Sequence, residues 1–480
     1  MPAKIFSAAT LGLESELVEV EVDAFNTGMH HFTVVGLPDT TIKESRDRVS
    51  SALKNSGFLP PHRFGRITVN LAPADLPKNS PVYDVPMALG FLLATEQLSF
   101  NFRDKLFIGE LSLDGKVRPV GGVLPIALLA KKLGMAELYV PEKNAAEAAM
   151  VQGIRIIPIT SLSEVAQHLS GVKTLMPAPD MDREAMFQED SFLLDMKDVR
   201  GQEHAKRALE IAAAGGHNIL MSGPPGSGKT ILAKTLPSIL PKLNFEESIE
   251  ITKIFSIAGL LTRSNTLVAS RPFRSPHHSA SAVSLVGGGS FPKPGEISLA
   301  HRGVLFLDEF GEFSKNILEN LRQPLEDGCI TVSRAKGSLH FPARFILVAA
   351  MNPCPCGNMG DPERLCSCSP RETLRYKTRI SGPIMDRIDL HIEVPRIPFE
   401  KLEAPENAES SLTIRERVEK ARAIQYERFA GKGIFTNAEM GSALIREACP
   451  LDSASKSLLK QAVSTMHLSA RAYYRLIKLA

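Results

Sequence analysis

Short apolar runs separated by helical repeats make up the first third of the chain. The apolar runs predict strands at Leu17–Val22, His31–Val35, Arg66–Leu71, Lys105–Gly109, Glu137–Val140 and Arg155–Ile159. Between them, the helical spacing of apolar residues predicts helices at Thr41–Ser56 and Asp84–Thr95. Such alternation is typical of a mixed α/β domain, which we expect to span residues 1–172.

The pattern breaks after residue 172 and resumes at residue 197. Residues 173–196 are polar, with methionine and proline but no sustained repeat, which predicts an interdomain linker. Residues 197–398 alternate apolar runs with helical segments, which predicts an α/β core built on a parallel sheet. Residues 399–480 predict an α-helical domain, with the strongest repeats at Leu412–Phe429 and Ser453–Met466.

Composition and charge limit the classes of function. The chain has 480 residues, of which 44% are hydrophobic and 23% charged, as is ordinary for several globular domains. The net charge of +3 gives no general basic field, so any nucleic-acid site must be local. No apolar run is long enough to cross a bilayer and the N-terminus lacks a signal-peptide pattern, so we expect a cytoplasmic protein without a membrane partner.

A complete G-x-x-x-x-G-K-[ST] pattern follows the apolar run Asn218–Met221 and precedes a predicted helix. Its residues are Gly223, Pro224, Pro225, Gly226, Ser227, Gly228, Lys229 and Thr230. Glycines let successive backbone N–H groups face a polyphosphate, and the helix N-terminus adds partial positive charge. Lys229 then reaches the β- and γ-phosphates, and the Thr230 hydroxyl ligates Mg²⁺. The chain is therefore predicted to bind ATP or GTP with Mg²⁺.

Two further strands are predicted to end at the same site. The apolar run Val304–Leu307 leads into Asp308 and Glu309. We expect Asp308 to hold the Mg²⁺ shell and Glu309 to polarise the attacking water. The run Phe345–Ala350 leads to Asn352, which could orient that water. The alternatives are a solvated acidic pair and an ordinary asparagine turn.

Several of these segments together resemble the AAA+ ATPases. Finer matches resemble the magnesium-chelatase-like branch, and within it the ComM/YifB family, over essentially the whole chain. The segments that carry the resemblance are Asp198–Gln202, Phe273–His278, Gly295–His301, Asn352–Gly357 and Gly382–Asp389. The implied fold is a Lon-like α/β domain, a P-loop AAA+ core and a helical lid.

This resemblance also implies roles for two arginines and a function. Arg387 matches the arginine finger that reaches a neighbouring subunit's ATP, and Arg471 matches the second sensor arginine of the lid. A finger supplied in trans implies a homo-hexameric ring. The implied activity is an ATP-driven DNA helicase that promotes branch migration in recombination and natural transformation, acting on single-stranded or branched DNA. The alternative is a magnesium-chelatase-type ATPase motor that remodels a protein partner.

A candidate DNA contact lies between the acidic strand and the Asn352 strand. Residues 329–341 predict a hairpin, and related AAA+ helicases carry a pore-lining hairpin at this place. Arg334 and Lys336 near its tip could contact phosphates. A solvated hairpin tip is the alternative reading.

Four of the six cysteines, Cys354, Cys356, Cys366 and Cys368, lie within fifteen residues of one another. Paired thiols around a short loop can close a tetrahedral structural Zn²⁺ site. The C-x-C spacing is tighter than the usual C-x₂-C, and unmetallated reduced thiols are the alternative.

The N-terminal domain resembles the proteolytic domain of Lon, notably at Gly109–Gly122. Lon-type peptidases use a Ser–Lys dyad. Here Val82 stands at the position of the nucleophile and Leu124 at the position of the lysine. We therefore expect a non-proteolytic domain.

Overall fold

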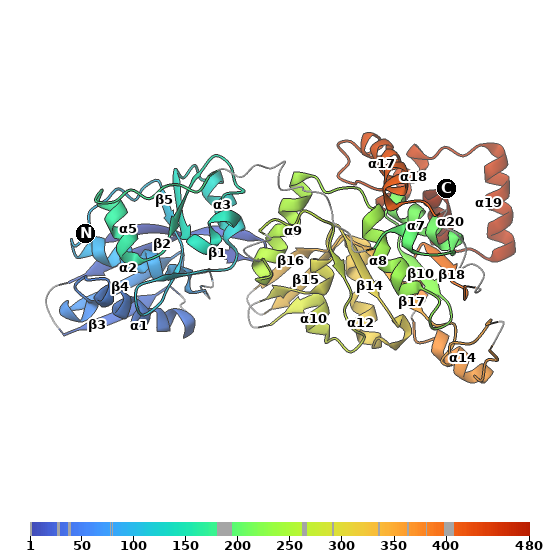
Figure 1. Ribbon diagram of the computed structural model, residues 1–480, viewed down its shortest axis with the longest axis horizontal. Coiled ribbons are helices and arrows are strands. Elements are labelled where there is room, and N and C mark those ends of the chain that lie inside the picture. Colours follow the sequence, from blue (N-terminus) through green and yellow to red (C-terminus); the bar gives the residue numbers. More distant parts are fainter. Residues whose placement is uncertain are drawn as a thin grey trace. The chain divides into compact units, whose positions relative to one another are not determined.

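The computed structural model folds into two compact units, whose elements are labelled in Figure 1. It describes residues 2–25, 29–36, 40–76, 78, 80–179, 194–261, 266–289, 292–334, 337–361, 364–380, 382–397 and 408–480. The first unit comprises residues 1–188, 248–269 and 290–293, and the second comprises residues 189–247, 270–289 and 294–480. The predicted boundaries at residues 172, 196 and 398 stay predictions. None of the described helices is long and apolar enough to span a bilayer.

The first unit is built on a seven-stranded mixed sheet with the order β3-β4-β2-β1-β5-β8-β9. The strands are β1 (Ala3–Leu11), β2 (Glu14–Ala24), β3 (His31–Val35), β4 (Arg66–Ala72), β5 (Lys105–Phe107), β8 (Glu137–Pro141) and β9 (Arg155–Ile159), with a small hairpin of β6 (Glu110–Leu111) and β7 (Val117–Arg118). The helices are α1 (Thr40–Asn55), α2 (Asp84–Ala94), α3 (Val123–Lys132), α4 (Ala145–Ala148) and α5 (Leu162–Leu169).

Alternation along β2 explains how this sheet acquires a buried face. Val18, Val20 and Val22 are fully buried, whereas Glu19 and Glu21 between them are only half-buried and pair with Lys4 of β1. Helix α2 packs on the valine face of β1 and β2. Hydrophobic residues of the segment 248–269 join the same core, a grouping that the linear pattern does not predict.

The second unit is built on a five-stranded parallel sheet with the order β11-β14-β17-β10-β18. Its strands are β10 (Ile219–Ser222), β11 (Phe273–Arg274), β14 (Val304–Leu307), β17 (Ile346–Met351) and β18 (Leu390–Glu393). The short strands β12 (Gly287–Gly288) and β13 (Lys293–Pro294) and the hairpin strands β15 (Cys329–Arg334) and β16 (Gly337–Pro342) lie outside this sheet.

The helices of this part of the chain fall into a core set and a C-terminal set. The core set is α7 (Glu203–Gly215), α8 (Lys229–Ile239), α10 (Ala282–Val286), α11 (Glu296–Leu299), α12 (Lys315–Asn320), α13 (Arg322–Asp327), α14 (Pro370–Lys377) and α15 (Gly382–Met385). Helix α9 (Phe245–Ala258) begins in the second unit, but from Ser248 onward it belongs to the first unit. The C-terminal set is α17 (Ser411–Arg428), α18 (Ser442–Ala448), α19 (Ser453–Met466) and α20 (Ala470–Leu479). The predicted parallel-sheet core and helical C-terminal region are confirmed.

Both faces of the parallel sheet are covered. Every residue of β14 and β17 is buried, and alternate residues contribute to two different cores. Val304 and Phe306 belong to one core, whereas Leu305 and Leu307 belong to the other. Continuous apolar strands of this kind are what a parallel sheet between two helical layers requires.

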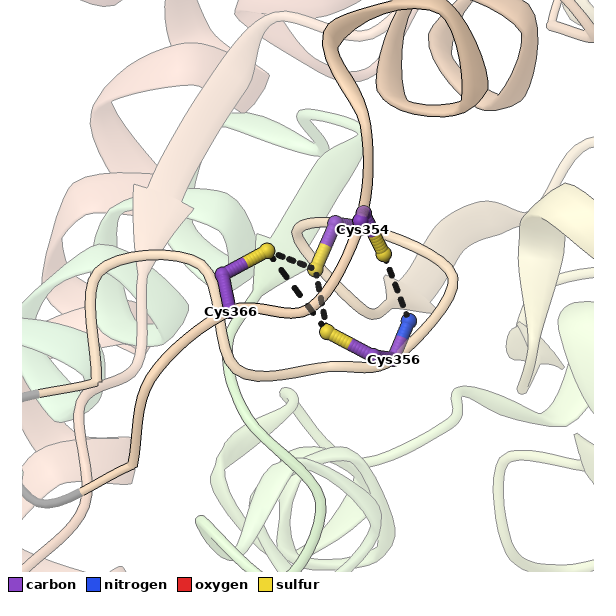
Figure 2. Close-up of side chains that lie close together, drawn as sticks. Cys354, Cys356 and Cys366 are labelled. Atoms are coloured by element: carbon purple, nitrogen blue, oxygen red, sulfur yellow. Dashed lines mark hydrogen bonds between the residues drawn. The ribbon is translucent and has the colours of Figure 1, made fainter.

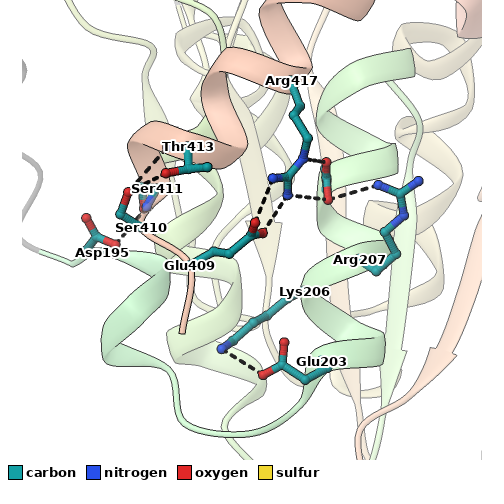
Figure 3. A network of polar contacts seen from close by, with 10 residues as sticks. Asp195, Glu203, Lys206, Arg207, Glu409, Ser410, Ser411, Thr413 and Arg417 are labelled. Carbon is teal, nitrogen blue, oxygen red and sulfur yellow. Dashed lines mark hydrogen bonds and ion pairs between the residues drawn. The ribbon is translucent and has the colours of Figure 1, made fainter. Parts of the chain in front are cut away.

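Polar contacts attach helix α17 to the core of the second unit, as Figure 3 shows. Arg417 donates to Glu210 of α7 at 2.7 Å and to Glu409 at 2.6 Å. The backbone N–H of Ser411 donates to Asp195 at 2.8 Å. Deeper in the contact, the guanidinium of Arg415 donates to the Ser238 carbonyl at 2.9 and 2.7 Å.

Candidate nucleotide-binding and ATPase site

The phosphate-loop segment connects β10 to α8 at the carboxyl edge of the parallel sheet. Strand β10 ends at Ser222 and α8 begins at Lys229, so the loop leads directly into a helix N-terminus. Gly226 and Gly228 have φ values of +78° and +91°, which only glycine adopts without strain. A Cβ at Gly223 would overlap the Val394 carbonyl oxygen, so the backbone approach there also requires glycine.

The Lys229 side chain lies folded into the loop. Its buried Nζ donates to the carbonyls of Gly223 at 2.7 Å and Pro224 at 2.9 Å. Burial lowers the pKa of the Lys229 ammonium, and the negative charge of Asp308 partly opposes this. In this structure the ammonium thus donates to carbonyls of the loop itself.

Two oxygen donors suited to Mg²⁺ lie next to the loop. The Thr230 hydroxyl donates to Asp308 Oδ2 at 2.8 Å. Asp308 follows the end of β14, and its other oxygen accepts the Glu309 backbone N–H at 2.9 Å. A hydroxyl and a carboxylate are oxygen donors of the kind that Mg²⁺ prefers, so these residues fit the ion and would hold it.

Glu309 has an unusual backbone and an unexpected partner. Its φ of +51° places a non-glycine residue in the left-handed region. The His278 Nδ1 lies 2.8 Å from Glu309 Oε2. The role of His278 was not anticipated from the sequence, although it belongs to the Phe273–His278 segment noted there. Its position shows that the loop after β11 reaches the acidic residue.

Strand order brings Asn352 beside the other two segments. Strand β17 lies between β14 and β10, with Ala349 opposite Leu307 and Met351 opposite Ser222. Asn352 follows β17 directly. The phosphate loop, Asp308 and Asn352 therefore emerge from three adjacent parallel strands at one sheet edge, where α/β folds bind ligands.

A cavity of about 1300 Å³ opens beside the first residues of the phosphate loop. Its wall combines residues before α7, the loop after β17 and the segment after β18; these include Arg200, Gln202, Gly223, Met359 and Arg396. Gln202 Nε2 donates to the Pro395 carbonyl at 2.5 Å and to the Ser227 carbonyl at 3.3 Å, which ties two of these segments to the loop. A cavity of this size accommodates the base and ribose of a nucleotide.

Arg387 and Arg471 lie with each other and not with the phosphate loop. Arg387 forms an ion pair with Glu326 of α13, and Arg471 Nη2 lies 3.4 Å from the same carboxylate. Burial lowers the pKa of Arg387, and the positive charges of Arg471 and Arg322 lower it further. Both arginines line a separate cavity of about 600 Å³.

The four clustered cysteines bring their sulfur atoms together, as Figure 2 shows for three of them. All four Sγ atoms lie within 4.8 Å of one another. The Cys354–Cys356, Cys354–Cys366 and Cys356–Cys366 sulfur pairs are 3.4, 3.7 and 3.6 Å apart. Backbone N–H groups of Asn358 and Ser367 lower the pKa of Cys356 to about 5. The cluster could hold a metal ion.

The candidate DNA-contact residues are only partly described. The predicted hairpin is confirmed, because β15 pairs antiparallel with β16 and Arg334 lies opposite Gly337. Lys336 lies outside the described residues, and only the backbone of Arg334 is described.

In the first unit, Val82 and Leu124 are buried core residues. Among the described residues of this unit, Lys78 donates to the Pro73 carbonyl, and Ser112 bonds to Asp114. Neither contact forms a Ser–Lys pair.

Comparisons with known proteins cover the whole chain. Residues 195–402 match the family described as magnesium chelatase, subunit ChlI; residues 18–144 match subunit ChlI of Mg-chelatase; residues 408–480 match its C-terminal part. The chain is 46% identical to competence protein ComM of Haemophilus influenzae, over 100% of this chain and 92% of that protein. It is 44% identical to the uncharacterized protein YifB of Escherichia coli, over 99% of this chain and 92% of that protein.

A weaker similarity concerns the N-terminal part alone. The chain is 28% identical to the Lon protease of Azorhizobium caulinodans in a match 163 residues long, which covers 32% of this chain and 19% of that protein. The Lon-like character predicted for the N-terminal domain is therefore confirmed as a similarity.

Proposed function

Because the chain belongs to the magnesium-chelatase-like family of AAA+ ATPases that includes the ComM and YifB proteins, we propose that it is an ATP-driven DNA motor. In this proposal it assembles as a homo-hexamer and acts as a helicase on single-stranded or branched DNA. It promotes branch migration during recombination and natural transformation. The observation that carries the proposal is the similarity over the full chain to a competence protein.

The residues at the sheet edge have distinct roles in hydrolysis. Thr230 and Asp308 would hold Mg²⁺, which would supply positive charge to offset that of the nucleotide phosphates. Glu309 accepts a proton from the attacking water, and Asn352 orients that water. Lys229 and the loop N–H groups bind the phosphates.

The arginine positions support a site shared between subunits. Arg387 and Arg471 line a different cavity from the phosphate loop, so a role at ATP requires a neighbouring copy. Among the described residues, Arg387 Nε is buried without a hydrogen-bond partner, so the guanidinium keeps one unsatisfied donor in this conformation. A guanidinium supplied in trans is worth a factor of about 10³–10⁵ in the rate of hydrolysis.

The remaining parts have supporting roles in this proposal. The β15–β16 hairpin presents Arg334 and Lys336 to DNA phosphates, and ATP turnover moves it along the strand. The first unit is a non-proteolytic scaffold. The four-cysteine cluster holds a structural Zn²⁺, and the protein acts in the cytoplasm.

A second candidate is favoured by the names of the matched families. A magnesium-chelatase-type motor would use the same ATPase site to remodel a protein partner. DNA should then leave ATP turnover unchanged, and a protein partner should stimulate it.

Steady-state ATP hydrolysis with and without DNA tests the proposal. We expect single-stranded or four-way-junction DNA to stimulate the wild type. Glu309→Gln should lose hydrolysis by about 10²- to 10⁴-fold, the usual contribution of a general base, while it still binds ATP. The control is Glu312→Gln, because Glu312 lies on the same loop but pairs with Arg379 at 3.0 Å. Turnover that no DNA stimulates would contradict the DNA motor, and an active Glu309→Gln would contradict the site.

A further inference from the structure

The sulfur geometry of the cysteine cluster matches a tetrahedral zinc site. A Zn–S bond of about 2.3 Å places neighbouring sulfur atoms about 3.8 Å apart in a tetrahedron. The three sulfur pairs among Cys354, Cys356 and Cys366 are 3.4–3.7 Å apart, far longer than a disulfide bond. Two backbone donors also point at sulfur: Cys356 N–H to Cys368 at 3.3 Å and Met359 N–H to Cys354 at 3.3 Å. Such donors stabilise metal-bound thiolates.

The loop that carries these cysteines lies against the phosphate loop. Gly357, which follows Cys356 directly, has φ +80°. A Cβ at Gly357 would lie 2.6 Å from Cδ and 2.8 Å from Cγ of Pro225. The backbone beside one sulfur ligand is therefore in direct contact with the proline ring of the phosphate-binding segment.

The same loop also forms part of the nucleotide cavity. Met359, whose N–H donates to the Cys354 sulfur, lines that cavity together with Gly223 and Pro224. Farther along the loop, Asp361 pairs with Arg396 at 3.2 Å. Arg396 belongs to the segment after β18 and also lines the cavity. Between β17 and α14 the described residues form no regular helix or strand, so few backbone hydrogen bonds hold the loop in place.

We infer that the four-cysteine loop is a metal-dependent wall of the nucleotide site, so that Zn²⁺ binding sets the affinity for ATP. A metal cross-link replaces the hydrophobic core that a short irregular loop lacks. It fixes Gly357 against Pro225 and Met359 against the cavity. The inference rests on the proposed zinc and ATP sites, but it does not depend on DNA as the substrate.

Removal of the metal from the full-length protein provides the first test. Elemental analysis should find about one Zn²⁺ per chain, and a chelator should release it in a buffer whose reductant keeps the thiols free. The zinc-free protein, returned to Mg²⁺ buffer, should bind a non-hydrolysable ATP analogue about tenfold or more weakly. Added Zn²⁺ should restore the affinity. A double Cys329→Ser, Cys449→Ser variant is the control, because these cysteines lie outside the cluster; it should keep the Zn²⁺ content and the zinc-dependent ATP affinity of the wild type.

A glycine variant separates the metal from the contact it supports. Gly357→Ala keeps all four cysteines and should keep its Zn²⁺, but its Cβ displaces Pro225 and should weaken ATP binding about tenfold. Gly431→Ala is the matched control, because Gly431 also has a positive φ, +75°, and its Cβ would meet nothing within 4 Å. It should cost a similar backbone strain and leave ATP affinity unchanged.

Two results would overturn the inference: fewer than about 0.2 Zn²⁺ per chain, or equal ATP affinity in the zinc-loaded and zinc-free proteins when both remain folded by circular dichroism. DNA stimulation is measured separately at saturating ATP. Zinc-dependent affinity without DNA stimulation would support the inference and contradict the DNA motor. DNA stimulation together with a zinc-independent ATP affinity would support the DNA motor and contradict the inference.

Discussion

At the residue scale, Glu309 combines a left-handed backbone conformation with a side-chain contact to His278. Its left-handed φ of +51° is a conformation that costs about 1–3 kcal/mol in a non-glycine residue. The His278 ring nitrogen lies 2.8 Å from its carboxylate and competes with any water that the carboxylate could polarise. We therefore expect this pair to restrain hydrolysis in the free protein.

Removal of the His278 ring should release this restraint. A hydrogen bond of this kind contributes about 0.5–1.5 kcal/mol, which corresponds to a change of about 2- to 10-fold in the population of free carboxylate. His278→Ala should raise DNA-free ATP turnover by that factor and reduce further stimulation by DNA. His277→Ala is the control, since its Nδ1 bonds to Ser279. Turnover that falls as far as in Glu309→Gln would show that His278 supports hydrolysis.

Glu147 should make the first unit sensitive to pH. Burial raises its pKa, although hydrogen bonds from Ser256, Leu124 and Asn144 partly oppose this shift. The folded state thus favours the protonated form of Glu147. The contribution of this residue to stability is complete below the ordinary pKa of 4.5 and is lost as pH rises through the raised pKa.

The comparison of wild type with Glu147→Gln over pH tests this sign. The free energy of unfolding of the wild type, relative to the variant, should fall as pH rises above 4.5, the ordinary pKa, and through the raised pKa of Glu147. Denaturant titrations at several pH values measure it, with the exposed Glu142→Gln as control. A difference that stays constant or rises with pH would contradict the prediction.

At the element scale, helix α17 is attached to the core by two arginines in different environments. Arg415 is buried and donates twice to the Ser238 carbonyl. The Arg417 side chain is 41% exposed, and its ion pairs with Glu210 and Glu409 are screened by solvent. The buried arginine should therefore contribute more to stability than the solvent-exposed one.

Alanine substitutions in α17 test this ranking. Arg415→Ala should lower the free energy of unfolding by about 1.5–3 kcal/mol, since it removes charge-assisted hydrogen bonds from a buried carbonyl. Arg417→Ala should cost about 1 kcal/mol or less. Thermal or denaturant unfolding measures both, and an equal or reversed order would contradict the ranking.

Elements with strong periodicity were predictable, and those decided by packing were not. The repeat at Ser453–Met466 is α19, and the repeat at Leu412–Phe429 is α17 within one residue. Strand β1 was missed because Ala3–Leu11 consists largely of small residues with weak alternation, and its pairing with β2 makes it a strand. The Arg387–Glu326 and His278–Glu309 contacts join segments far apart in sequence, so no local pattern could indicate them.

At the scale of the whole molecule, the role proposed for Arg387 predicts that ATP hydrolysis needs a neighbouring copy, because this arginine lines a different cavity from the phosphate loop. In a mixed ring, a Lys229→Ala subunit should impair its own site and the coordinated turnover of its neighbours. ATPase activity should therefore fall more steeply than the fraction of wild-type chains when the two proteins are mixed. The control is Lys234→Ala, an exposed lysine of the same helix. A linear decline would indicate independent subunits.

The most direct test of the DNA motor is migration of a synthetic four-way junction by the purified protein with ATP and Mg²⁺. We predict that the wild type moves the branch point and releases the product duplexes, and that Glu309→Gln binds the junction but leaves it in place. A wild-type protein that hydrolyses ATP and leaves the junction unmoved, with no stimulation of turnover by DNA, would contradict the proposed function.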